Sequence, residues 1–260
     1  MNGLLAIIFL DMKRFWLDRV RLFAGLLQPL LYLFVLGGGI GASSVQGGAF
    51  YRSFIFPGVV CLAMLFTATF AAIVIVFDRQ VGFFKAVLVS PVSRTAIGVG
   101  KVISGAMQAM VQGLILLLFA PLAGVSLSFF SVLETVVAMA LVAMTFSAIG
   151  VALASRFRST TVFPIMTNAV LLPMFFLSGA MFPLDRAPAW MKKLAHLDPV
   201  AYGVDLMRQA LLGQTSAFFP LWLDVLVLVA ATCLLSWAAV RVFARGEETG
   251  LGATQFPWRR

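Results

Sequence analysis

Charge is scarce in this chain. Only 11% of its 260 residues are charged, with ten aspartates and glutamates and a single histidine, His196. The hydrophobic share is 62% and the mean hydropathy is +1.03. Soluble domains carry about 25% charged residues, so a water-soluble monomer is excluded. Few groups remain for metal binding or for acid–base catalysis.

Motifs of nucleotide or hydrolytic chemistry are also missing. The sequence contains no H-E-x-x-H and no G-x-S-x-G. Residues 98–101 read Gly-Val-Gly-Lys, but a phosphate-binding loop needs glycine at 95 and Ser or Thr at 102, where Thr95 and Val102 stand. We therefore expect any nucleotide to be bound by another chain. The two cysteines, Cys61 and Cys233, lie in long apolar runs and are expected to be small buried apolar residues.

Long uncharged runs predict the fold. A bilayer core of about 30 Å needs roughly 20 helical residues, and most of the runs are that long. The sequence predicts an all-α integral membrane protein, a single permease domain over 1–260. Six transmembrane helices are expected at 22–41, 54–77, 102–123, 130–154, 160–183 and 219–242.

Basic residues predict the orientation. With the N-terminus inside, the inner segments carry 14 of the 19 lysines and arginines, while the acidic residues divide equally. This bias places both termini, including a tail at 243–260, in the cytoplasm of a multi-pass cell (inner) membrane protein. No clustered basic face with interleaved aromatics is present, so nucleic acid is not an expected partner.

The N-terminal segment 2–20 is amphipathic. Its apolar residues recur at spacings of three and four, while Asp11, Arg14 and Asp18 fall on another face and are spaced for pairing within the helix. We expect an interfacial helix lying flat on the inner leaflet. An extension of the first span is the alternative.

An inner loop at 78–94 predicts a short cytoplasmic helix that Ser90-Pro91 ends. Its aromatic knob and basic residues suit docking into a groove of a soluble subunit. A stretch resting on lipid is the alternative. The coupling candidates are Asp78, Arg79, Phe83, Phe84, Lys85, Leu88, Ser90, Pro91 and Arg94.

Prolines divide the outer segment after the fifth span into two short pieces, about 188–197 and 200–212. We expect two outer re-entrant helices within 186–212 that narrow the exit from a cavity, since non-helical backbone is tolerated at membrane depth when protein or water satisfies it. A plain exposed loop is the alternative. The gate candidates are Phe182, Pro183, Trp190 and Tyr202, of which Trp190 and Tyr202 suit the membrane interface.

Polar residues inside the apolar runs are the cavity candidates: Gln28, Thr67, Thr69, Thr167 and Asn168. Any of them also has the alternative of bonding to a neighbouring helix. The small residues Gly105, Ala109 and Gly113 suit close helix contact, within one subunit or at a dimer seam. The 25 phenylalanines and 12 methionines suit a hydrophobic or amphipathic cargo, and equally suit lipid.

Three blocks carry a resemblance to a known family: residues 78–94, residues 173–184 (PMFFLSGAMFPL) and residues 198–213 (DPVAYGVDLMRQALLG). Over essentially its whole length the chain resembles a type-2 ABC exporter permease, a group that includes multidrug-resistance and nodulation-export permeases. The resemblance implies a six-helix subunit that pairs with a second copy, as a homodimer, and docks on two cytoplasmic ABC ATPase subunits. Those subunits would bind the ATP and Mg; the permease itself would need no cofactor. Relatives commonly carry an acidic residue at or beside Ala86, which is absent here.

Two rival functions remain open at this stage. The first is a membrane-embedded enzyme acting on a lipid substrate around Asp185, His196 and Asp198, which would turn over without ATP. The second is a membrane anchor that recruits an ATPase and transports nothing.

Overall fold

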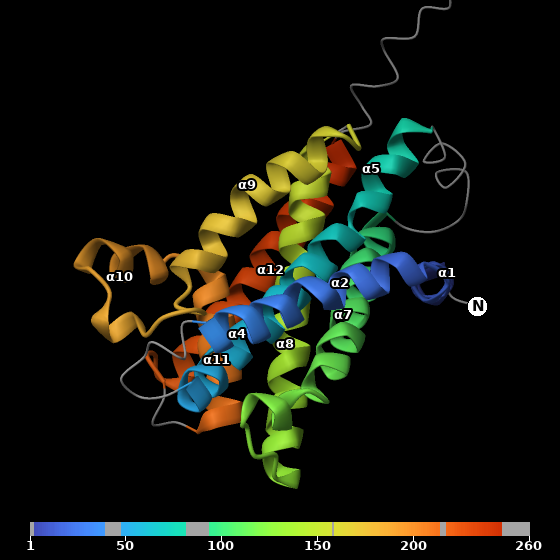
Figure 1. The fold of residues 1–260 in the computed structure, drawn as a ribbon. Helices are drawn as coiled ribbons and strands as arrows, with labels where there is room; N and C mark the ends of the chain where they lie inside the picture. The colour runs from blue at the N-terminus through green and yellow to red at the C-terminus, as the bar shows by residue number, and fades with distance from the viewer. Residues whose placement is uncertain (1–2, 40–47, 82–93, 158, 214–216, 246–260) are drawn as a thin grey trace, which may run out of the picture.

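The structure is a computed structural model that describes residues 3–39, 48–81, 94–157, 159–213 and 217–245. Within these ranges every regular element is a helix. Long helices pack side by side into one bundle, and the shorter α10 projects from its flank (Figure 1).

The N-terminal part consists of two helices joined at Asp18. Helix α1 spans Gly3–Leu17 and α2 spans Arg19–Leu31, with the Asp18 carboxylate accepting a hydrogen bond from the Arg21 N–H at 3.0 Å. The predicted helix over 2–20 corresponds to α1. A π-helical turn, Tyr32–Leu36, continues α2 just after Pro29, whose missing N–H interrupts the regular hydrogen-bond ladder.

The predicted spans in the middle of the chain are present with shifted ends. The second span comprises α4, Gly48–Ala71, and α5, Ile73–Gln80, with a break at Ala72. Helix α7, Arg94–Leu117, starts eight residues before the predicted 102. A 3₁₀ turn, Ala120–Ala123, and Gly124 at φ +81° end this helix, and α8, Phe129–Arg156, follows.

The fifth predicted span, 160–183, is too long. Helix α9 covers only Val162–Leu177, because the chain turns at Gly179, whose φ of +74° favours glycine. A short 3₁₀ turn, Leu184–Arg186, leads to α10, Ala189–Ala195. Helix α11, Pro199–Leu212, and α12, Leu221–Arg245, complete the described chain.

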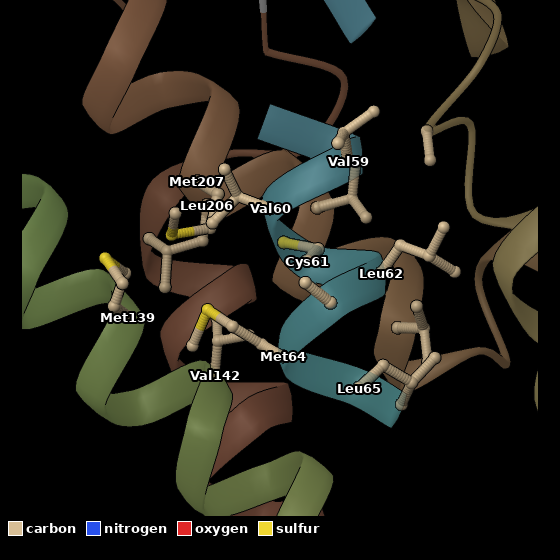
Figure 2. Packing of buried hydrophobic residues seen from close by; sticks show 14 of the residues in the cluster. Val59, Val60, Cys61, Leu62, Met64, Leu65, Met139, Val142, Leu206 and Met207 are labelled. Atoms are coloured by element: carbon tan, nitrogen blue, oxygen red, sulfur yellow. The ribbon is translucent and has the colours of Figure 1, made fainter. Parts of the chain in front are cut away.

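The core lies where α4, α8 and α11 meet. Figure 2 shows Val60, Cys61 and Met64 of α4 facing Leu206 and Met207 of α11, with Met139 and Val142 of α8 beside them; all are buried. The predicted close contact of α7 occurs within this subunit. A Cβ on Gly105 would lie 2.4 Å from Ser147 Oγ of α8, and one on Gly113 would lie 2.4 Å from Met139 Cε.

Within the described residues, five segments are long and apolar enough to cross a membrane: Arg19–Gly39, Phe50–Gln80, Thr95–Leu117, Phe129–Arg156 and Leu221–Arg241. The fifth predicted span, α9, is not among them: it has 16 residues and a length of about 24 Å at 1.5 Å per residue. The chain is a multi-pass membrane protein. The first and last segments are only 17% buried against 72% for Phe50–Gln80, so α2 and α12 lie at the periphery and α4 at the centre.

Candidate functional site

A buried ion pair fastens α1 to the N-terminal part of α7. Asp11 is 6% exposed, and its two carboxylate oxygens lie 2.9 and 3.0 Å from Lys101 Nζ. Ser104, one turn along α7, donates its hydroxyl to the same carboxylate at 2.8 Å. The predicted pairing of Asp11 within its own helix is therefore wrong: α1 turns Asp11 toward α7 and leaves Phe9, Trp16 and other apolar residues exposed.

The end of α5 is fixed to α8 and to the start of α9. The Arg79 guanidinium donates to the carbonyls of Ala154 and Ser155 at 3.4 and 3.0 Å, which complements the negative end of α8. Thr160 donates to the Gln80 side chain at 2.9 Å. Helix α5 is thereby held where it would enter the predicted coupling loop.

Of the coupling candidates, only Asp78, Arg79 and Arg94 belong to helices in the described part of the chain, at the end of α5 and the start of α7. The others lie outside the described residues: Phe83, Phe84, Lys85, Leu88, Ser90 and Pro91. Their role in coupling stays a prediction.

The structure separates the five cavity candidates. Thr67, Thr69 and Thr167 are buried, and Thr69 lies inside the α4–α8 contact, where a Cβ on Gly150 would come within 2.6 Å of its Cα. Gln28 of α2 is exposed and Asn168 of α9 is half-buried. These two amides are therefore the candidates that reach the surface. Their helices, α2 and α9, both pack against α4.

The two outer helices differ in burial. Eleven of the 14 residues of α11 are buried, and this helix packs against α4, α8 and α12. The alternative of a plain exposed loop is therefore wrong for α11. Helix α10 exposes most of its length, including Trp190 at 57%, and its main helix contact is with α9.

The gate candidates are not gathered at one point. Pro183 and Trp190 are exposed and Phe182 is half-buried. Tyr202 is buried within the bundle, and its expected position at the membrane interface stays a prediction. Its hydroxyl donates to the His196 carbonyl at 2.9 Å, and its ring stacks on Phe219 at 4.3 Å between centroids.

A buried polar network joins α11 to the start of α12. The Asp205 carboxylate accepts the backbone N–H groups of Phe218 and Phe219 at 2.9 to 3.0 Å. Gln209 donates to Asp224 at 2.6 Å, to the Phe219 carbonyl at 3.1 Å and to Asp205 at 3.2 Å. These contacts fix the face of α11 that carries Asp205 and Gln209 against the segment that enters α12.

Arg208 connects α11 to two further helices. Its side chain is 2% exposed and lies 3.8 Å from the Asp205 carboxylate. It donates to the Gly179 carbonyl at 2.8 Å, in the turn after α9, and its guanidinium carbon sits 4.3 Å from the ring centroid of Phe54. Arg208 therefore ties α11 to both α9 and α4.

Burial perturbs two carboxyl groups of this region. At the start of α11, burial raises the pKa of Asp198 to about 7, although the Val200 N–H donates to it at 2.8 Å and opposes the rise. Burial also raises the pKa of Asp205, against the N–H groups of Phe219 and Phe218 and the nearby Arg208. His196, named in the lipid-enzyme alternative, contacts the Lys192 carbonyl at 2.7 Å with its ring and stacks edge-on against Phe219.

The comparison with known families decides the class. Residues 3–212, from α1 to the end of α11, match the family described as ABC-2 type transporter. The chain belongs to the ABC-2 type transporter family. This confirms the resemblance noted from residues 78–94, 173–184 and 198–213, and it makes the chain a membrane transport subunit rather than an enzyme.

Relatives of this ABC-2 permease are similar over most of their length. Nodulation protein J of Rhizobium leguminosarum bv. viciae is 30% identical over 220 residues, covering 83% of this chain and 85% of the relative. Nodulation protein J of Sinorhizobium fredii is 29% identical, covering 79% of each. A putative transport permease, ycf38, of Cyanophora paradoxa is 25% identical, covering 77% of this chain and 70% of the relative.

Sequence reasoning missed both polar anchors of this ABC-2 permease. Asp205 and Arg208 lie three apart within a short, mostly apolar helix, a spacing that allows an ion pair on one face. Because unpaired charges are not left in apolar surroundings, that spacing was a usable signal. Asp11 and Lys101 are 90 residues apart, and nothing local links them. The expected burial of Cys233 is wrong. This residue is exposed, and it belongs to α12 at the periphery of the bundle.

Proposed function

We propose that this chain is the transmembrane subunit of an ATP-driven ABC exporter and forms the pathway for a hydrophobic or amphipathic cargo. The observation that carries the proposal is the family match, which runs continuously from α1 to α11 and so includes the inner, central and outer elements described above. The relatives named as nodulation proteins and transport permeases support the same function.

The energy would come from two cytoplasmic ABC ATPase subunits that bind ATP and Mg. In support, residues 98–101 lie in the regular helix α7 and not in a loop between a strand and a helix, where a phosphate-binding motif operates. The coupling loop 78–94 would dock on the ATPase. Arg79 anchors its membrane end on α8, so a push on the loop would reach α8 and α9.

In this proposal the chain crosses the inner membrane six times, with α9 as the short fifth span and both termini in the cytoplasm. Helices α10 and α11 would be re-entrant from the outside. A second copy of the permease would complete the pathway as a homodimer. The peripheral α2 and α12 expose apolar faces to the surrounding lipids or to that copy.

The cavity would be lined by the surface that α2 and α9 form on either side of α4. Gln28 and Asn168 support this, because amide side chains at such positions are costly against lipid and are better placed against water or cargo. The cargo class covers a drug, a lipid or a lipid-linked glycan. The relatives named nodulation proteins favour a product exported during nodulation.

ATP binding would draw the two ATPase subunits together and shift the permease toward an outward-open or laterally open state, and hydrolysis would reset it. A nucleotide can drive this shift only through its different affinity for the two states, so the coupling loop must transmit that difference. Phe83, Phe84 and Lys85 are the residues proposed to do so.

The test is ATP-driven uptake of a labelled lipid or lipid-linked glycan into inverted vesicles that contain the permease and its ATPase. Replacing Phe83, Phe84 and Lys85 together with alanine should abolish uptake and leave ATP hydrolysis by the complex at half of wild type or more. Lys13→Gln, an exposed change on α1, is the matched control and should transport normally. Wild-type vesicles that hydrolyse ATP without uptake would favour the anchor reading, and lipid turnover without ATP would favour the enzyme reading; either result refutes the proposal.

A further inference from the structure

Three outer parts of the bundle converge on one side of α11. Arg208 reaches the Gly179 carbonyl in the turn after α9 and the Phe54 ring of α4. Asp205 and Gln209 reach the backbone at Phe219, where the chain enters α12. Each of these contacts joins segments that are distant in sequence, so α11 is the common support of the outer ends of α4, α9 and α12.

The chemistry of these contacts specifies position more than it adds stability. A buried ion pair gains little over well-packed apolar residues, because both charges lose their hydration. Here Asp205 and Arg208 are 1% and 2% exposed, and the second carboxylate oxygen of Asp224 has no hydrogen-bond partner among the described residues. Such a network tolerates only one arrangement, since any displacement of α11 leaves charges buried without partners.

The turn that Arg208 holds carries two of the gate candidates. Residues 178–184 include Phe182 and Pro183, and the same turn is fixed by Tyr51, whose hydroxyl donates to the Met181 carbonyl at 3.2 Å. Ala180 of the turn packs against α4 so closely that a Cβ on Gly58 would lie 2.7 Å from Ala180 Cβ. The turn therefore has a single position against α4 and α11.

Helix α10 is attached mainly at its C-terminal end, where Ala195 is buried, the Tyr202 hydroxyl donates to the His196 carbonyl at 2.9 Å and the His196 ring stacks edge-on against Phe219. Lys192 donates to the Asp185 carbonyl at 2.7 Å, an exposed bond within the same outer segment. The apolar Trp190, Leu194 and Leu197 are exposed, and Figure 1 shows α10 projecting from the bundle. Of the two outer helices, α10 is the one whose movement breaks few contacts.

We propose that Arg208 is the positioning residue of the outer gate: paired with Asp205, it holds α11 as a fixed wall and sets the 178–184 turn, so that the exit opens by movement of α10. The proposal rests on the proposed export function. It assigns α11 a part that neither the family match nor the names of the relatives describe.

The accessibility of the native Cys61 reports whether α11 stays in place. Cys61 of α4 is fully buried under α11, with its thiol 3.7 Å from the Gly203 carbonyl (Figure 2). If α11 moves away, Cys61 becomes accessible to the membrane-permeant reagent N-ethylmaleimide. The exposed Cys233 is replaced by alanine to remove the competing thiol. Leu194→Cys in the same background reports on α10.

The permease is reconstituted with its ATPase in nanodiscs and labelled without nucleotide and after trapping with ATP and vanadate. We expect Cys61 to be labelled at least tenfold more slowly than Leu194→Cys in both states, and the labelling rate of Leu194→Cys to change at least threefold between them. Cys61 becoming as reactive as Leu194→Cys after trapping would overturn the fixed wall.

The double variant Asp205→Asn/Arg208→Gln removes both charges together, so neither is left buried alone. It should raise Cys61 labelling at least tenfold without nucleotide and lower cargo transport at least tenfold, while ATP hydrolysis continues. Arg208→Lys keeps the charge beside Asp205 but loses the fork that also reaches Gly179; it should keep Cys61 protected and lower transport three- to tenfold. Glu134→Gln changes an exposed residue near the start of α8. It is the control and should match wild type in labelling and in transport.

Wild-type labelling and transport in either Arg208 variant would refute the positioning role. The labelling without nucleotide does not depend on transport. If the wild-type complex moves no cargo, the export function fails, whereas the comparison of Cys61 between wild type and the double variant still decides the role of Arg208.

Discussion

The ion pair between α1 and α7 makes a quantitative prediction. In Asp11→Asn the side chain keeps its size and can still accept the Ser104 hydroxyl, but Lys101 loses its counter-charge. Removing one partner of a buried pair costs about 3–5 kcal/mol. Lys101 keeps 12% of its side chain exposed in the N-terminal part of α7, so water recovers part of that cost. A loss of about 2 kcal/mol is expected, in line with about 1.5–3 kcal/mol for a hydrogen bond to a charged group.

This loss should be local. Helix α1 packs mainly on α7 and only weakly on α2, so its undocking leaves the core between α4, α8 and α11 intact. A cost of about 2 kcal/mol corresponds to about a 30-fold larger open fraction of α1. Hydrogen–deuterium exchange measured by mass spectrometry in nanodiscs should show that much faster exchange in residues 3–17, with residues 129–156 unchanged.

Two controls separate the ion pair from a general effect on α1. Lys13→Gln changes an exposed charge on the same helix and should not alter its protection. The exchanged pair Asp11→Lys/Lys101→Asp should restore most of the protection, because the two charges still face each other. Unchanged exchange in Asp11→Asn, or equal loss in Lys13→Gln, would show that this pair does not hold α1.

Three further predictions follow from single sites. Between about pH 4 and pH 7 the folded protein binds more protons at Asp198 than the unfolded chain does, because folding raises the pKa from 3.8 to about 7. The free energy of unfolding should therefore fall by up to about 4 kcal/mol as the pH rises through this range. Asp198→Asn should lose this part of the pH dependence in thermal unfolding in detergent, and parallel pH profiles of variant and wild type would contradict the prediction. Gly150→Ala places a Cβ 2.6 Å from the Thr69 backbone and should cost about 1–3 kcal/mol of stability, while Gly38→Ala, with no atom within 4 Å, should cost nothing; equal unfolding temperatures would refute the tight α4–α8 contact. Gln28→Leu and Asn168→Leu should each lower vesicle uptake severalfold at unchanged thermal stability if these amides face the cavity, and normal uptake would place them against lipid.

Helix ends and side-chain partners were predicted with unequal success. The fourth and sixth spans, predicted at 130–154 and 219–242, agree with α8 and α12 within three residues, because charged residues bound these apolar runs on the inner side. The fifth span was predicted to end six residues too late, at 183 instead of Leu177. Apolarity continues through Phe182, while the helix ends where Gly179 adopts a positive φ. Hydropathy measures which residues favour lipid and is insensitive to such a turn.

In the outer region, the starts of the helices were predicted from the sequence but their burial was not. Prolines 188 and 199 marked the starts of α10 and α11, since proline suits the beginning of a helix and disfavours its interior. The sequence did not predict that α11 is buried while α10 is largely exposed. Tyr202 was expected at the membrane interface from its residue type, and it is buried because α11 inserts between α4, α8 and α12.

The sequence by itself determined that this is a multi-pass helical membrane protein and which family it belongs to, because segment hydropathy, charge bias and short blocks are properties of local stretches of chain. Only the tertiary structure decided which helices touch. In lipid, apolar faces gain little from each other, so partners are chosen by close packing and by polar contacts. Those contacts join residues far apart in the chain, such as Asp11 with Lys101 and Arg208 with Gly179, and they appear only once the helices have assembled.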